Sequence, residues 1–144
     1  MRSLSTISCI ISFVLLSCSE APKSEKEESN IIDYIYQNFA IPQKEIQFIF
    51  VLNPKNNCGA CQKVAFELST QYKEEVTIVA PLKLARFYNQ PNVLTDASGE
   101  VFKRMGSSFN SKLYLVKNKK LVKEFIVSPG NEQEILNEIK SLKI

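Results

Sequence analysis

The pattern of apolar and polar positions predicts a chain that mixes strands and helices. Residues 45–52 and 75–80 are dense runs of β-branched and aromatic residues, the pattern of strands buried on both faces. Between them, over residues 58–72, apolar residues recur at three- and four-residue intervals, which predicts a helix. A strand–helix–strand unit crosses over with right-handed connectivity, so these two strands are expected to be parallel.

The C-terminal third predicts a hairpin followed by a helix. Two short apolar runs flank residues 117–120, where Asn118 is suited to the positive φ of a tight turn. We therefore expect the two runs to form an antiparallel hairpin. Asn131 has Glu134 three residues later, the spacing of a capping box, and predicts the start of the last helix. The full set of expected elements is a helix at 31–39, strands at 45–52 and 75–80, a helix at 58–72, short helices at 82–88 and 100–105, a short strand at 92–95, strands at 112–116 and 121–127, and a final helix from 131. The expected fold class is therefore α/β, a mixed sheet with helices on both faces.

The first seventeen residues have the organisation of a signal peptide. Arg2 gives a positive start, and residues 4–16 are mostly apolar. That apolar run is too short for a resident membrane span, which needs about 20 apolar residues. We therefore expect residues 1–17 to be a cleaved export signal.

The end of this segment, Leu15-Leu16-Ser17-Cys18, resembles the bacterial lipobox. The resemblance implies that Cys18 receives lipid, with acyl chains such as palmitate, and becomes the new N-terminus. The alternative is an ordinary signal peptide with an incidental cysteine. Ser19 in place of Asp favours the outer membrane under the enterobacterial sorting rule, with the domain facing the periplasm or the surface. Residues 18–30 are mostly polar and charged, which predicts a disordered tether between the lipid and a domain over residues 31–144.

The cysteine count agrees with this division of the chain. Of the four cysteines, Cys9 leaves with the signal peptide and Cys18 is lipidated, so only Cys58 and Cys61 remain. Histidine is absent from the sequence, which excludes histidine general-base catalysis and Cys–His nucleophile pairs. The formal net charge of +3 gives no strong electrostatic footprint for nucleic acid.

The order of elements around Cys58-Gly59-Ala60-Cys61 resembles the thioredoxin superfamily over residues 45–142. Within that range, the segment 96–106 followed by the strand at 113–116 resembles the TlpA or peroxiredoxin-like branch. The resemblance implies a thioredoxin-like fold and thiol–disulfide exchange on protein substrates. Where the family has an aromatic residue before the first cysteine, a buried Asp and a cis-proline, this chain has Asn57, Leu52 and Ser111. The resemblance thus places Asn110 and Ser111 at the substrate groove.

The Cys-x-x-Cys pair has a definite chemistry of its own. Cys58 is expected at a helix N-terminus, where free N–H groups and the helix dipole stabilise a thiolate. Lys55 and Lys63 lie close in sequence and add positive charge. Cys61 falls nearly one turn later and would resolve the mixed disulfide. Proton transfer would fall to water or to a carboxylate such as Glu67.

Three interpretations of the pair remain open at this stage. The first is an envelope thiol–disulfide oxidoreductase with Cys58 and Cys61 as its catalytic residues. The second is a non-catalytic lipoprotein that binds a partner or scaffolds a complex, with a structural disulfide. The third is a metal site, for which the sequence offers only the thioethers Met1 and Met105 beside the two thiols. For the first interpretation we expect no bound cofactor, no nucleic acid, a monomer, and as partners a redox protein and protein thiol or disulfide substrates.

Overall fold

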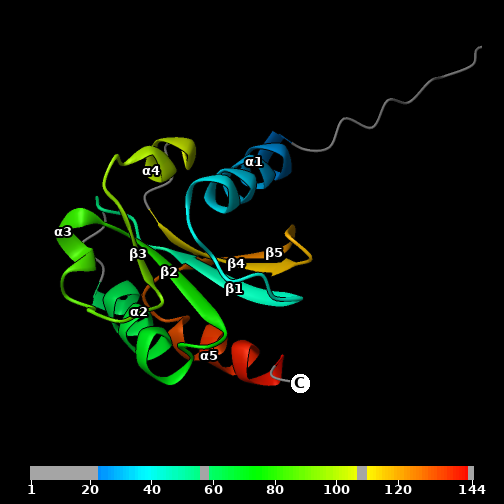
Figure 1. Ribbon diagram of the computed structural model, residues 1–144. Coiled ribbons are helices and arrows are strands. Elements are labelled where there is room, and N and C mark those ends of the chain that lie inside the picture. Colours follow the sequence, from blue (N-terminus) through cyan, green and yellow to red (C-terminus); the bar gives the residue numbers. More distant parts are fainter. Residues whose placement is uncertain (1–22, 56–58, 107–109, 143–144) are drawn as a thin grey trace, which may run out of the picture.

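The computed structural model describes residues 23–55, 59–106 and 110–142, and it is built around a five-stranded sheet (Figure 1). The strand order across the sheet is β3-β2-β1-β4-β5. The elements, in chain order, are α1 (Lys23–Asn38), β1 (Ile46–Val51), α2 (Gly59–Gln71), β2 (Val76–Pro81), α3 (Leu82–Ala85), β3 (Val93–Asp96), α4 (Glu100–Arg104), β4 (Ser111–Lys117), β5 (Lys120–Val127) and α5 (Glu132–Ser141). Each expected element is present, with boundaries that differ mostly at the ends.

The strand directions confirm the expected connections. β1 is parallel to β2, with Phe48 opposite Val76, and β2 is parallel to β3. β4 runs antiparallel to both β1 and β5, so the C-terminal hairpin adds its strands beside β1. β1 therefore lies at the centre of the sheet, between the parallel and the antiparallel halves.

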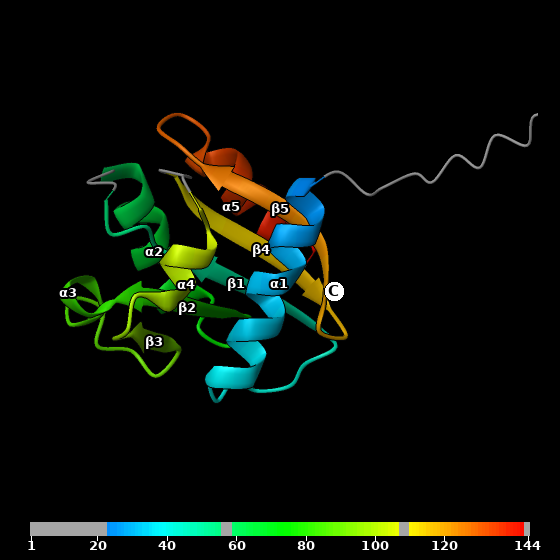
Figure 2. The same ribbon diagram turned by 90° about the horizontal axis from the view of Figure 1, so that it is seen from above.

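Helices cover both faces of this sheet because the buried strands alternate their side chains (Figures 1 and 2). On β1, Phe48 and Phe50 face α2 and α5, whereas Ile49 and Val51 face α1 and α4. Successive residues of a strand point to opposite faces, so one apolar run supplies two cores. Each core is a set of buried side chains closed by helices, and Cys61 belongs to the one beneath α2 and α5.

The hairpin turn adopts the expected left-handed backbone. Asn118 has a φ of 49° and Lys119 a φ of 64°. Two successive positive φ values characterise the type I′ turn, whose twist matches that of the flanking strands. The prediction for Asn118 is confirmed, and Lys119 shares its conformation.

The first helix begins earlier than the sequence pattern predicted. α1 starts at Lys23 rather than at residue 31, so the expected tether overlaps the helix from residue 23 to residue 30. The expectation rested on the polar composition of this stretch, which cannot form a core. Lys and Glu are nevertheless good helix formers, and a helix anchored at one end by Ile31, Ile32 and Ile35 extends readily into such a sequence.

The expected side-chain cap at Asn131 is wrong. The Asn131 side chain makes no capping hydrogen bond to α5. Instead, Asn131 Oδ1 accepts the Ser128 N–H at 3.0 Å and its Nδ2 donates to the Ile126 carbonyl at 2.8 Å. The side chain thus fixes the connection between β5 and α5, because Asn readily bonds nearby backbone in turns.

The strand order, the parallel β1–α2–β2 unit and the terminal hairpin with its helix together define the architecture. The fold is thioredoxin-like. No helix among the described residues is long and apolar enough to cross a membrane.

Candidate functional site

The candidate site lies where β1 ends and α2 begins. The chain leaves β1 at Val51, passes through the loop that precedes the cysteine motif, and enters α2 at Gly59. Cys61 is the third residue of α2. Cys58 and Asn57 lie outside the described residues, as do Cys18 and the predicted signal peptide, so their roles stay predictions from the sequence.

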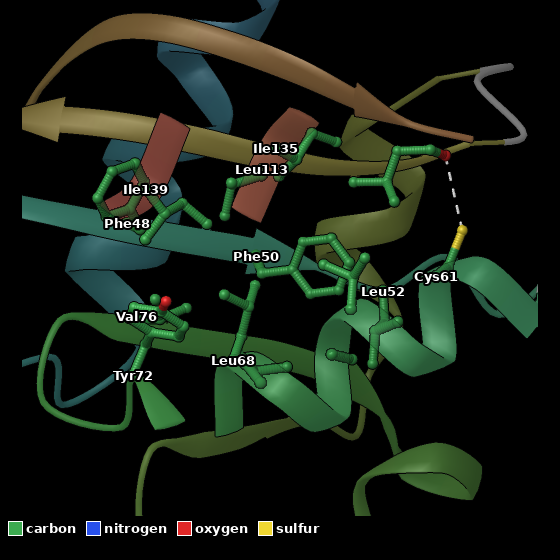
Figure 3. Close-up of a cluster of buried hydrophobic side chains, with 14 of the residues drawn as sticks. Phe48, Phe50, Leu52, Cys61, Leu68, Tyr72, Val76, Leu113, Ile135 and Ile139 are labelled. Carbon is green, nitrogen blue, oxygen red and sulfur yellow. Dashed lines mark hydrogen bonds between the residues drawn. The ribbon is translucent and has the colours of Figure 1, made fainter. Parts of the chain in front are cut away.

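Cys61 is enclosed by the core beneath α2 and α5. Its side chain is 1% exposed and packs in the same cluster as Phe50, Leu52 and Ile135 (Figure 3). The Cys61 Sγ donates a hydrogen bond to the carbonyl oxygen of Val127, at 3.6 Å. Because Val127 ends β5, this contact joins the first turn of α2 to the last residue of the edge strand.

A second contact ties the loop after β1 to the start of β4. The Asn53 N–H donates to Ser111 Oγ at 3.1 Å, and Asn53 Oδ1 accepts the Lys55 N–H at 2.8 Å. Asn53 is only 6% exposed. At the start of the loop that leads into the cysteine motif, both the backbone and the side chain of Asn53 are therefore held by hydrogen bonds.

The two predicted groove residues differ in their exposure. Ser111 is completely buried, so its hydroxyl faces the protein and holds Asn53 rather than lining a surface. Asn110, immediately before it, is half-buried. No peptide bond between described residues is cis, and the bond between Asn110 and Ser111 is among those described.

Tyr88 is a buried aromatic residue of the same core that the sequence analysis did not single out. It follows α3, where its N–H donates to the Ala85 carbonyl at 3.1 Å, and its side chain is 8% exposed. It belongs to the same buried cluster as Cys61. Burial raises the pKa of Tyr88, and the negative charge of Cys61 raises it further.

Other residues proposed for the motif lie elsewhere. Lys55 and Lys63 are both exposed. Glu67 is half-buried and lies six residues beyond Cys61, roughly 9 Å further along α2 and about 240° around its axis. It therefore points away from the sulfur, and the expectation that it serves as the proton-transfer group is not supported by its position.

Of the two thioethers considered for a metal site, Met1 lies outside the described residues and Met105 lies away from Cys61. Met105 is buried among residues of α1 and α4, on the opposite face of the sheet from Cys61. Within the described ranges there is no group of three His, Cys, Asp or Glu side chains that could hold a metal ion. The described part of the site thus holds the buried thiol of Cys61, the Val127 carbonyl that accepts its hydrogen bond, and the Asn53–Ser111 hydrogen bond of the preceding loop.

Comparisons with known proteins give structural similarities at low sequence identity. A putative thioredoxin from Neisseria meningitidis is 18% identical over 69% of this chain and 75% of its own, with a TM-score of 0.47. A secreted disulfide oxidoreductase of Mycobacterium tuberculosis, homologous to DsbE of E. coli, is 17% identical over 68% of this chain and 82% of its own, with a TM-score of 0.46. StoA from Bacillus subtilis is 18% identical over 69% of this chain and 85% of its own, with a TM-score of 0.45. No protein-family model matches the sequence, and no curated protein matches it.

Proposed function

We propose that this protein is a thiol–disulfide oxidoreductase of the bacterial cell envelope that acts through Cys58 and Cys61 on exported proteins. The observation that carries the proposal is the position of Cys61: a cysteine in the first turn of a helix that directly follows the central strand, buried to 1% exposure. We therefore expect Cys58, three residues earlier in the sequence, at the N-terminus of this helix, the environment that lowers a thiol pKa. In disulfide exchange, a thiol at a helix N-terminus suits the attacking role and a buried thiol suits the resolving role.

The proposed reaction divides these roles between the two sulfurs. The Cys58 thiolate attacks a substrate disulfide and forms a mixed disulfide, releasing one substrate thiolate. Cys61, as a thiolate, then attacks Cys58 Sγ, forms the Cys58–Cys61 disulfide and releases the second substrate thiolate. Two electrons pass from the pair to the substrate, and the two protons of the dithiol end on the released thiols. The reverse sequence oxidises a substrate dithiol.

A reduction-potential measurement tests the proposal directly. The full-length chain, with Cys9 and Cys18 replaced by Ser and kept in mild detergent, is equilibrated in glutathione and dithiothreitol buffers, and free thiols are trapped and counted. We expect a potential between about −120 and −270 mV, the range of working oxidoreductases. A potential below about −300 mV is that of a structural disulfide and would favour the scaffold interpretation instead.

We also propose that the protein is a lipoprotein held at a membrane through Cys18. The support is the sequence of residues 1–18, a short apolar signal that ends in Leu-Leu-Ser-Cys. Each buried CH₂ of an acyl chain contributes about 0.8 kcal/mol, and more than one chain gives stable anchoring. Such an anchor would keep the redox domain beside the membrane, and Ser19 is the feature that favours the outer one.

Cell fractionation tests this anchor. In an expressing bacterium, we expect the protein in the membrane fraction to incorporate a labelled palmitate analogue. The substitution Cys18→Ser should remove the label and the mature lipid-modified form, while Cys9→Ser should leave both unchanged. Unlabelled wild-type protein, or equal labelling of the Cys18→Ser variant, would argue against the lipobox.

A further inference from the structure

The segment that carries the cysteine motif is tied to the sheet at both of its ends. At its start, the Asn53 N–H donates to Ser111 Oγ at 3.1 Å. At its end, Cys61 Sγ donates to the Val127 carbonyl at 3.6 Å (Figure 3). Ser111 is the first residue of β4 and Val127 the last of β5, and the antiparallel ladder places them opposite each other. One residue pair of this hairpin therefore holds both ends of the segment.

The residues that make these attachments are buried and fixed by their surroundings. Ser111 and Val127 are completely buried, and Asn53 is nearly so. The Asn131 side chain bonds the backbone of the residues on either side of Val127, which holds the end of β5 in place. Because water has little access to Asn53, a hydrogen bond lost there is not readily replaced by solvent, and its loss costs free energy.

Holding this segment has a consequence for the equilibrium between dithiol and disulfide. Cys58 lies between Asn53 and Cys61 in the sequence, so the tied segment contains both motif cysteines. The stability of a disulfide depends on the effective concentration of one thiol at the other, which rises as the chain that joins them is held more firmly. A disulfide restrains the segment by its own covalent bond, whereas the dithiol depends on the hydrogen bonds at the segment's ends. Loss of the Asn53–Ser111 bond therefore frees the dithiol more than the disulfide.

We propose that Ser111 is a positioning residue of the redox pair, whose buried hydroxyl holds the segment that starts at Asn53 and thereby favours disulfide formation within it. When the disulfide forms, the two thiols release two protons and two electrons, and these reduce a disulfide of the buffer or substrate to two thiols. Ser111 acts through Asn53 and exchanges neither protons nor electrons. This role rests on the proposed function in one respect, since it requires that Cys58 and Cys61 form a reversible disulfide.

The reduction potential of the pair tests this role. The parent is the full-length chain with Cys9→Ser and Cys18→Ser in mild detergent, and it is equilibrated beside its Ser111→Ala variant in glutathione and dithiothreitol buffers. We expect Ser111→Ala to lower the equilibrium constant for disulfide formation about fivefold. At about 30 mV per tenfold change, the potential becomes less negative by about 20 mV. Ser111→Thr retains the hydroxyl and should keep the potential of the parent.

The matched control is a buried serine of α2 that makes no bond to the tied segment's start. Ser69 is 1% exposed, and its hydroxyl donates to the Phe66 carbonyl within the helix, at 2.9 Å. Urea denaturation should show that Ser69→Ala and Ser111→Ala both lose stability. Only Ser111→Ala should shift the reduction potential, because a general loss of stability does not by itself separate dithiol from disulfide.

The outcomes separate this inference from the proposed function. If Ser111→Ala has the potential of the parent, or if Ser69→Ala shifts it equally, the inference is overturned. If Ser111→Ala does not fold, Ser111→Val is compared with Ser111→Thr, which has the same shape and keeps the hydroxyl. A less negative potential for the Val variant supports the role, and equal potentials contradict it. A parent potential in the range of structural disulfides, together with the expected shift, would remove the proposed function and leave the positioning role of Ser111.

Discussion

Replacing Cys58 with Ser is expected to abolish disulfide exchange, lowering turnover by about a thousandfold or more, because no other sulfur can make the first attack. Replacing Cys61 with Ser should give a different defect. The first attack proceeds, but the mixed disulfide has no resolving thiol and accumulates as a covalent complex with the substrate. The measurement is reduction of a disulfide-bonded protein, followed by non-reducing electrophoresis under acid quench.

The comparison of the two cysteine variants is what gives the experiment its strength. Both lose the Cys58–Cys61 disulfide, so a purely structural bond predicts some loss of stability in each and no covalent complex with substrate in either. Cys9→Ser serves as a control that leaves the pair intact. Equal behaviour of Cys58→Ser and Cys61→Ser, with full function of the remaining protein, would support a scaffold. Thermal unfolding of each variant shows whether the polar Ser is tolerated at the buried position 61, which is 1% exposed.

The sheet could be predicted from the sequence because its strands carry their own signal. The run Ile46–Val51 is apolar at nearly every position, and the structure buries both of its faces. The hairpin turn at Asn118 was predictable for a similar reason, since its backbone conformation depends on the turn residues themselves. Local chemistry decides these features, and local chemistry is what a sequence pattern contains.

Features that depend on distant contacts were not predictable in this way. Tyr88 and Cys61 belong to one buried cluster, and the parallel pairing of β1 with β2 brings the segments that follow these strands to the same edge of the sheet. The buried hydroxyl of Ser111 accepts the Asn53 N–H across 58 positions of sequence, a contact that no local pattern indicates. The Asn131 side chain, by contrast, fails as a cap for a local reason, because it bonds Ile126 and Ser128 of the preceding connection instead of the helix that follows. Ser111 and Asn131 each had more than one possible hydrogen-bond partner, and the folded structure decides which partner is used.

The largest stability effect is expected for Phe50→Ala, in the core on which Cys61 rests. Phe50 is completely buried at the centre of β1, two residues before Leu52, and its ring packs between the sheet and α2 (Figure 3). Removing a buried Phe ring leaves a cavity and costs about 3–5 kcal/mol, a large part of the roughly 5–15 kcal/mol that stabilises a domain. Urea denaturation followed by circular dichroism measures the free energy of unfolding.

The exposed residue Phe66 provides a matched control for that measurement. Phe66 lies on α2 with 60% of its surface exposed, so Phe66→Ala should change the free energy of unfolding by about 0.5 kcal/mol or less. Equal losses in the two variants would mean that α2 does not cover β1 as the structure has it. If Phe50→Ala alone is destabilising, the same variant should also loosen the first turn of α2, because Cys61 packs in the cavity-forming cluster. The reduced Cys61 thiol should then react faster with an alkylating reagent in Phe50→Ala than in Phe66→Ala. The comparison is made at a urea concentration where both variants remain folded. The burial that stabilises the domain is thus the same burial that keeps the proposed resolving thiol away from solvent.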